Sequence, residues 1–202
     1  MKPYYDDGRG IVIFHGDCRE ILPTLPKVDL VLTDPPYGLG DKLTGGNWGK
    51  RVGEAAVWDS LVDELPEVIA HGESQIVWGG NYYPLPLTRC WLGWIKRDSV
   101  RTCASLELAW TNFDAPSKYF DWPIGATNSQ RNGHPTIKPF ELMTWCLSFA
   151  PNAQTILDPF MGSGTTLRAA KDLGRKCIGI EIEEKYCEIA AKRMSQEVLQ
   201  FT

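Results

Sequence analysis

Short apolar runs alternate along this chain with segments of helical periodicity, and this alternation limits the possible folds more than any other feature. Strands are expected at 11–17, 28–34, 75–80, 90–96, 106–113, 154–158 and 176–182. Helices are expected at 18–25, 55–70, 139–150, 167–174 and 183–199. Strands that alternate with helices in this way favour an α/β fold with a mostly parallel sheet. Segments 90–96 and 106–113 are expected to form an antiparallel pair, and 114–137 to be loop.

Length and composition are those of one globular domain. The chain has 202 residues, of which 43% are hydrophobic and 23% charged, and it shows no internal repeat or clear linker, so a single domain over 1–202 is expected. No apolar stretch approaches the roughly 20 residues that would span a bilayer. The first residues lack the apolar segment of a signal peptide, which predicts a cytoplasmic protein without membrane partners.

The six cysteines form no C-x-x-C pair and have no matching histidine spacing. This pattern favours reduced, buried thiols over a metal site, so no metal is expected. Four tryptophans in strand-like segments are expected to be core residues rather than platforms for stacking bases: Trp78, Trp91, Trp94 and Trp110.

Charge is unevenly distributed along the chain. The formal net charge is −4, but residues 86–140 hold seven Lys or Arg against four acids. A nucleic-acid ligand would therefore be expected to contact the middle of the chain. A random scatter of a few charges explains the same excess equally well.

The strand at 28–34 runs into the stretch "TDPPYG" at 33–38. A simple turn would not need both the Asp34 carboxylate and the Tyr37 ring. Pro35 and Pro36 have fixed φ angles and keep carbonyl acceptors while lacking N–H donors. The stretch therefore combines a rigid backbone, two hydrogen-bond acceptors and an aromatic surface.

A strand–turn–helix–strand run from 154 to 182 is typical of a nucleotide-binding unit. Gly162 and Gly164 allow a sharp turn and close approach of a ligand, and Glu181 ends the next strand, where a carboxylate can accept hydrogen bonds from ribose hydroxyls. The dinucleotide fingerprint is incomplete because Leu167 stands at the third glycine position, and no phosphate-binding lysine motif is present. Asp158 before the turn suits a ligand with a positive end, such as S-adenosylmethionine. A plain helix–strand junction would also contain such glycines.

Together, "TDPPYG" (33–38), "HPTIKP" (134–139) and "ILDPFMGSGTT" (156–166) resemble the β-class of amino-methyltransferases, over nearly the whole chain. The resemblance implies S-adenosylmethionine-dependent, site-specific methylation of adenine N6 in DNA, and phage and prophage enzymes share a stretch similar to "QIVWGGNYY" (75–83). It also implies a Rossmann-like, doubly wound, seven-stranded sheet with helices on both faces, in the permuted motif order where D-P-P-Y precedes F-x-G-x-G.

The resemblance assigns cofactor contacts to a larger set of residues. The glycine turn and the start of the following helix would hold the methionine part, the acid at the end of the next strand the ribose, and the "HGDC" segment the adenine. The loop at 134–139 would close over the cofactor's carboxylate end. In that order the residues are Asp158, Phe160, Gly162, Gly164, Thr165, Thr166, Glu181, Asp17, Cys18, Thr136 and Lys138, with Asp34 also beside the cofactor. Asp17 could instead cap the helix that follows it, and Lys138 could be a solvated charge.

For the acceptor site, the resemblance implies catalytic roles for Asp34, Pro35, Pro36 and Tyr37. Asp34 and the Pro35 carbonyl would accept the two amine hydrogens, and Tyr37 would stack on a base swung out of the duplex. The loop at 38–53 is expected to fold over that base. Residues expected near DNA are Lys42, Lys50, Arg51, Arg97 and Arg131.

Target recognition has little chain available to it, only about 112–133. Two alternatives follow: either specificity is loose, or a second subunit, as in a homodimer, completes it. Four alternatives stay open: a cytosine-N4 target, an RNA adenine target, a silent partner subunit, and a dehydrogenase, which Leu167 and the D-P-P-Y turn disfavour.

Overall fold

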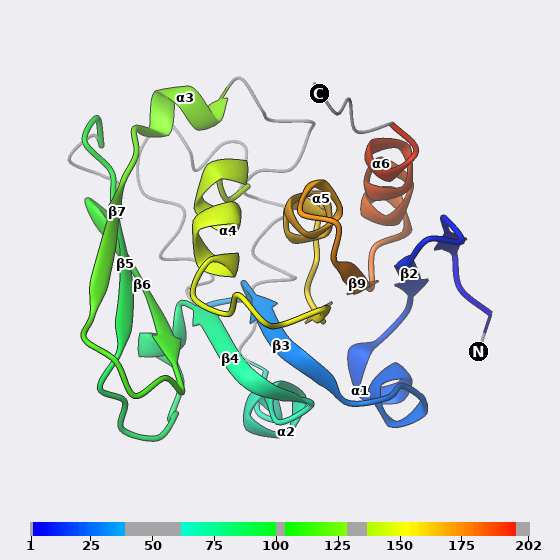
Figure 1. Cartoon of the computed structure of the whole chain (residues 1–202), viewed down its shortest axis with the longest axis horizontal. Helices are drawn as coiled ribbons and strands as arrows, with labels where there is room; N and C mark the ends of the chain where they lie inside the picture. The colour runs from blue at the N-terminus through cyan, green and yellow to red at the C-terminus, as the bar shows by residue number, and fades with distance from the viewer. Residues whose placement is uncertain (1, 39–61, 100–103, 129–136, 197–202) are drawn as a thin grey trace.

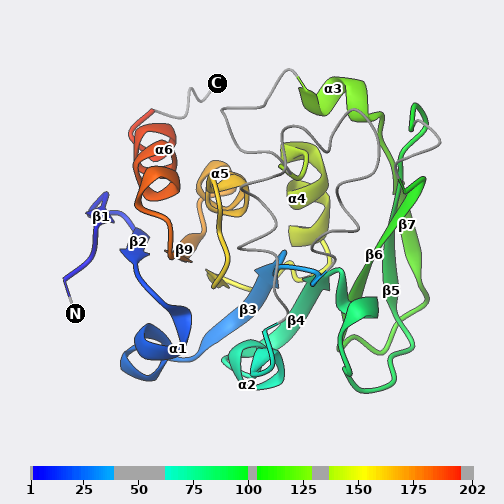
Figure 2. The same cartoon turned by 180° about the vertical axis from the view of Figure 1, so that it is seen from behind.

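The computed structural model describes residues 2–38, 62–99, 104–128 and 137–196. Within them the chain forms one mixed sheet with helices on both faces (Figures 1 and 2). The strands are β1 (Tyr5–Asp6), β2 (Ile11–His15), β3 (Val28–Thr33), β4 (Gly72–Trp78), β5 (Trp91–Ile95), β6 (Leu106–Thr111), β7 (Lys118–Asp121), β8 (Thr155–Asp158) and β9 (Lys176–Glu181). The helices are α1 (Cys18–Ile21), α2 (Leu65–Ile69), α3 (Ile124–Asn128), α4 (Phe140–Leu147), α5 (Thr165–Asp172) and α6 (Glu184–Met194), with 3₁₀ turns at Leu22–Thr24 and Gly80–Tyr82.

The strand order is β1-β2-β9-β8-β3-β4-β6-β5-β7. Strands β2, β9, β8, β3 and β4 are mutually parallel, whereas β6 is antiparallel to both β4 and β5. The α/β class, the parallel core and the antiparallel pair at 90–96 and 106–113 are therefore confirmed. Parallel strands require crossover helices, and those helices bury both faces of the sheet.

The described part of the sheet has nine strands, not the expected seven. The additional strands, β1 and β7, lie at the two edges and are two and four residues long. The expectation that 114–137 is loop is wrong for β7, which pairs with β5, and for α3. Nine of the 22 residues expected to be free for target recognition, those of β7 and α3, therefore belong to regular elements.

Two apolar layers enclose the sheet. Leu30 and Leu32 of β3 pack with α4, α5 and α6 on one face, while Val31 packs with α1 and α2 on the other. Figure 1 shows α4, α5 and α6 on one side of the sheet and α1 and α2 on the opposite side. The five cysteines within the described residues are free and buried, and Trp78, Trp94 and Trp110 are core residues, both as expected.

No helix in the described part of the chain is long and apolar enough to cross a membrane.

Candidate active site

Acidic residues gather at the carboxyl ends of the parallel strands. Asp17 follows β2, Glu181 ends β9, Asp158 ends β8 and Asp34 follows β3. Because carboxyl ends of neighbouring parallel strands meet at one edge, segments far apart in sequence come together there. The structure thus brings three predicted cofactor residues, Asp17, Asp158 and Glu181, to the same ends of the strands as the predicted acceptor residue Asp34.

The glycine turn after β8 is built as the sequence predicts. Gly162 and Gly164 have φ angles of 51° and 78°, which favour glycine. The Gly162 N–H donates to Glu181 Oε2 at 3.0 Å, and the Glu183 N–H donates to Oε1 at 2.9 Å. Burial raises the pKa of Glu181 despite these bonds. They fix the carboxylate at the end of β9, beside the turn.

Asp158 connects the glycine turn, where the predicted cofactor residues lie, to the end of β3, where the predicted acceptor residues begin. It is buried, and its Oδ1 accepts hydrogen bonds from Thr33 Oγ1 at 2.8 Å and from the Phe160 N–H at 3.2 Å. Burial raises the pKa of Asp158 to about 6, although hydrogen bonds from Thr166 and Thr33 oppose the shift. Thr33 is the last residue of β3, so this bond couples the turn after β8 to the start of "DPPY".

Asp17 caps α1 in this structure, since its Oδ1 accepts from the Arg19 N–H at 2.9 Å, and Arg19 also pairs with its carboxylate. The capping alternative is therefore correct as a structural role. It does not test the predicted contact with the cofactor, because a carboxylate oxygen accepts more than one hydrogen bond. Asp17 lies close to Glu181, whose carbonyl accepts the Gly16 N–H at 2.9 Å.

The D-P-P-Y turn at 34–37, called the acceptor turn below, is held in place by contacts with neighbouring residues. The Tyr37 hydroxyl donates to Asp34 Oδ1 at 2.6 Å, and its ring stacks on Tyr82 with centroids 5.2 Å apart. A Cβ on Gly79, whose φ is 68°, would lie 2.0 Å from the Tyr37 ring. The hydroxyl of Tyr83 donates to the Pro36 carbonyl. Burial and the charges of Asp34 and Glu107 raise the pKa of Tyr37 well above its usual value, so the phenol stays protonated.

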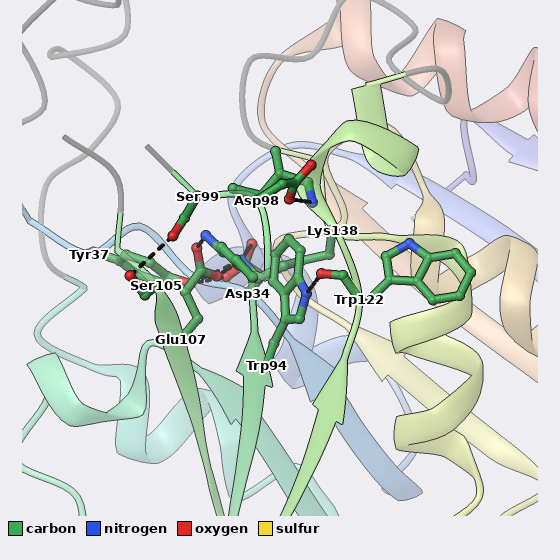
Figure 3. A network of polar contacts seen from close by, with 11 residues as sticks. Asp34, Tyr37, Trp94, Asp98, Ser99, Ser105, Glu107, Trp122 and Lys138 are labelled. Atoms are coloured by element: carbon green, nitrogen blue, oxygen red, sulfur yellow. Dashed lines mark hydrogen bonds and ion pairs between the residues drawn. The ribbon is translucent and has the colours of Figure 1, made fainter. Parts of the chain in front are cut away.

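Lys138 is not a solvated charge. It is 8% exposed, and its Nζ lies 2.5 Å from Asp34 Oδ2, 3.0 Å from the Tyr37 hydroxyl and 3.3 Å from Glu107 Oε2 (Figure 3). Glu107 also pairs with Lys96 through Oε1. Burial lowers the pKa of Lys138, but the charges of Asp34 and Glu107 outweigh it and hold the pKa above its usual value. Burial likewise raises the pKa of Glu107, but the two lysines outweigh it and the pKa is lowered.

Lys96 and Glu107 were not expected in the site. They reach the site because β6 runs antiparallel to both β4 and β5. The start of β6, with Glu107, and the end of β5, just before Lys96, therefore lie beside the carboxyl ends of β3 and β4. The expected antiparallel pairing of 90–96 with 106–113 was the signal that could have found them. Glu107 lies opposite Trp94, and Lys96, two residues further along, forms a diagonal cross-strand pair with it.

The remaining predicted residues are distributed as follows. Thr165 and Thr166 begin α5 and are buried, and Cys18 is the buried first residue of α1. Arg97 is exposed at the carboxyl end of β5 and pairs with Asp121. Outside the described residues lie Thr136, Lys42, Lys50, Arg51 and Arg131. Within the described ranges, no group of three or more His, Cys, Asp or Glu is arranged to hold a metal ion.

The chemistry of this edge fits S-adenosylmethionine. The sharp glycine turn lets backbone approach a ligand, and the side chains around it are acids, which suit ribose hydroxyls and a positively charged end rather than phosphates. A pyrophosphate would instead require positive charge and a crowd of free N–H groups.

Comparison with known proteins points to DNA methyltransferases. The sequence model of the DNA methylase family, the N6/N4 methyltransferases, matches residues 86–192. The type II methyltransferase M2.LlaDCHI of Lactococcus lactis subsp. cremoris is 50% identical, over 96% of this chain and 93% of its own. M2.DpnII of Streptococcus pneumoniae is 49% identical, over 97% and 93%. The M2.LlaDCHI alignment covers 250 positions, more than the 202 residues here, so that relative has segments this chain lacks.

Solved structures agree in fold. The M1.HpyAVI–SAM complex superimposes with a TM-score of 0.62 at 26% identity, covering 91% of this chain and 99% of that one. The cytosine-N4-specific PvuII DNA methyltransferase superimposes with a TM-score of 0.58 at 16% identity, over 95% and 88%, which supports the fold alone. The chain belongs to the DNA methylase family of S-adenosylmethionine-dependent DNA methyltransferases, and its fold is that of the class I enzymes.

Proposed function

We propose that this methyltransferase modifies the N6 amine of adenine in DNA. The observation that carries the proposal is the acceptor turn, in which Asp34 stands at the end of a buried parallel strand with its carboxylate oriented by Tyr37 and Lys138. In the resembling family, an aspartate before P-P-Y favours adenine over cytosine. The type II methyltransferases among the relatives support an enzyme of the same kind.

An exocyclic amine is a poor nucleophile because its lone pair is delocalised into the ring. Two acceptors aimed at its two N–H groups favour a pyramidal nitrogen whose lone pair can point at the methyl group. Asp34 would supply one acceptor. The Pro36 carbonyl is engaged by Tyr83, which favours the Pro35 carbonyl as the second. Because the proline φ angles are fixed, these acceptors need no further ordering during the reaction.

S-adenosylmethionine, when bound, supplies an electrophilic methyl group on its sulfonium. We infer that Asp158, Glu181 and the Gly162–Gly164 turn hold it, with Asp17 and Cys18 at its adenine end. The amine nitrogen forms a bond to the methyl carbon as the carbon–sulfur bond breaks. Asp34 need not be a strong base, since the nitrogen becomes acidic once it is methylated and then loses its proton.

The target base is inaccessible while paired, so adenine would be swung out of the duplex to reach Asp34. Tyr37 would then stack on the base, worth roughly 1–3 kcal/mol. In the described structure Tyr82 already stacks on the Tyr37 ring. A base on that face would have to displace Tyr82.

The test is methylation of DNA from a methylation-deficient strain, followed by mass spectrometry of the nucleosides. We expect N6-methyladenine from the wild type and a loss of about 10²-fold in rate with Asp34→Ala, comparable to removal of one preorganised transition-state contact. Glu73→Ala is the matched control, because Glu73 is an exposed acid at the opposite end of β4.

Three outcomes would contradict the proposal. N4-methylcytosine as the product would overturn the adenine assignment, and methylation of RNA in preference to DNA would overturn the substrate. Equal rates for the wild type and Asp34→Ala would overturn the role of the carboxylate. The predicted homodimer and the predicted DNA contacts of the residues outside the described ranges stay predictions.

A further inference from the structure

The acceptor carboxylate is occupied in this structure. Tyr37 donates to Asp34 Oδ1 at 2.6 Å, and the Lys138 ammonium lies 2.5 Å from Oδ2. A carboxylate in such close contact with an ammonium is a weakened acceptor for another N–H group. During methyl transfer the amine nitrogen also becomes positively charged, and a nearby ammonium would oppose that charge. The reaction proposed above is therefore favoured when Lys138 moves away from Asp34.

Glu107 offers Lys138 a second partner. Its Oε2 lies 3.3 Å from the Lys138 Nζ, yet this buried oxygen accepts no hydrogen bond of acceptable geometry within the described residues. Its other oxygen, Oε1, is held by Lys96, whose ammonium lies 4.5 Å from the centre of the Trp94 ring. A small shift of Lys138 toward Oε2 would complete a hydrogen bond there.

The side chains around Lys138 explain why this partner matters. Its ammonium faces Asp34, Tyr37 and Glu107, with the Trp78 ring centroid 5.9 Å away. A buried ammonium is stable only while paired. Without Glu107, Lys138 would have Asp34 as its only anionic partner among these side chains and would remain bound to it. Figure 3 shows Glu107, Lys138 and Asp34 side by side above the ends of the strands.

We propose that Glu107 is a positioning residue of the methyltransferase, which draws the Lys138 ammonium away from Asp34 when the target amine enters. Lys96 holds Glu107 in place and balances its charge. This inference rests on the proposed role of Asp34 as the acceptor of the amine hydrogen. It assigns a task to a buried acid that the sequence motifs do not include.

The test compares single-turnover methyl transfer to unmodified DNA at saturating S-adenosylmethionine, using the full chain. Glu107→Gln keeps the shape of the side chain and removes its charge. We expect its rate to fall about tenfold, as for other directly coupled neighbours, with little change in the affinities for DNA and S-adenosylmethionine. Glu73→Gln, an exposed glutamate on the same sheet, should retain the wild-type rate. A wild-type rate for Glu107→Gln would overturn the proposal.

A double variant separates positioning from simple charge balance. Glu107→Gln together with Lys96→Met removes one acid and one base, so the cluster stays neutral and its stability is protected if the single variant folds poorly. The proposal expects the rate to remain low, because Lys138 still lacks a second anionic partner. Restoration of the wild-type rate would mean that Glu107 serves only to balance charge.

A double-mutant cycle of Glu107 and Lys138 tests whether Glu107 affects the rate through Lys138. We expect Glu107→Gln to cause no loss of rate in the Lys138→Met background, because the ammonium that Glu107 draws away from Asp34 is then absent. Additive losses would overturn the proposal. If the wild type makes N6-methyladenine and Asp34→Ala does not, while Glu107→Gln matches the wild type, the proposed function stands and only this inference fails.

Discussion

Asp158 joins the glycine turn after β8 to the end of β3 through its hydrogen bond with Thr33, and its protonation should be visible in the stability of the protein. Its buried carboxylate accepts from Thr33 and the Phe160 N–H, and burial raises its pKa to about 6 from an ordinary 3.8. The folded state therefore binds this proton more tightly than the unfolded state. The stabilising contribution is complete below pH 3.8 and is lost as the pH rises through 6.

Replacing Asp158 with Asn should remove this pH dependence. From the pKa shift, the difference in unfolding free energy between Asp158→Asn and the wild type should move by about 2 kcal/mol in favour of the variant between pH 4 and pH 7. Urea unfolding without cofactor, at a series of pH values, measures it. The comparison cancels the other carboxylates, which titrate in both proteins. A difference that stays constant with pH would show that Asp158 titrates normally.

Among the individual residues, the acids of the site were predictable from the sequence, but the lysines and the glutamate that contact Asp34 or each other were not predicted to do so. Asp34, Asp158 and Glu181 follow apolar strands, so their position at one edge follows from the alternation of strands and helices. The contacts of Lys138 with Asp34 and Glu107 join residues far apart in sequence. Such contacts depend on strand order, which local patterns do not contain.

Among the elements, β3 and β8 carry the acceptor turn and the cofactor turn, and a side chain at their opposite ends fixes them together. Asp29 Oδ2 accepts hydrogen bonds from the Gln154 N–H, the Thr155 N–H and Thr155 Oγ1, each at 2.8 Å. The Asp29 N–H in turn donates to Thr155 Oγ1 at 3.0 Å. These bonds hold the pKa of Asp29 below its usual value.

Asp29→Ala would leave two backbone N–H groups without their acceptor. Since Asp29 is half-buried and water can replace part of the loss, we expect the unfolding free energy to fall by about 1–3 kcal/mol. Chemical denaturation at pH 7 measures the change. Glu73→Ala is the control and should stay within about 0.5 kcal/mol of the wild type. Equal stability of both variants would show that the register of β3 and β8 does not depend on Asp29.

The elements themselves were predicted unevenly, and the reason is physical. Strands such as β3 and β9 are nearly continuous apolar runs because both of their faces are buried. Strand β7, "KYFD", is an exposed edge strand with charged ends, and its position is set by pairing with β5 rather than by its own composition. Propensity alone therefore left it in the expected loop.

For the whole molecule, two of the basic residues in 86–140 contribute little to the surface, because the side chains of Lys96 and Lys138 are only 10% and 8% exposed. Of the five basic residues in 86–140 that the structure describes, four pair with acids: Arg89, Lys96, Arg97 and Lys138. Lys96 and Lys138 are directed into the acceptor site, where they balance Asp34 and Glu107. A count of charges along the sequence therefore overstates the positive surface that DNA would meet.

The strand directions separate two arginines that otherwise resemble each other. Arg89 precedes β5 and Arg97 follows it, so they lie at opposite ends of that strand. Of the two, Arg97 is at the end of the strands where Asp34 also lies. Their side chains are 67% and 64% exposed, and each pairs with one aspartate, Asp114 or Asp121. Because their exposure and pairing are similar, a difference between the two arginines in DNA binding would come from the end of β5 at which each one lies.

Arg97→Gln should reduce the salt dependence of DNA binding, and Arg89→Gln should not. Each phosphate contact releases condensed counterions, so the slope of log K against log salt should become shallower by about 1 for Arg97→Gln. Fluorescence anisotropy with an unmodified duplex over a range of NaCl concentrations measures the slope. Since both variants lose one exposed positive charge, the net charge of the molecule changes equally in both. Equal slopes for the two variants would contradict the predicted contact between Arg97 and a DNA phosphate.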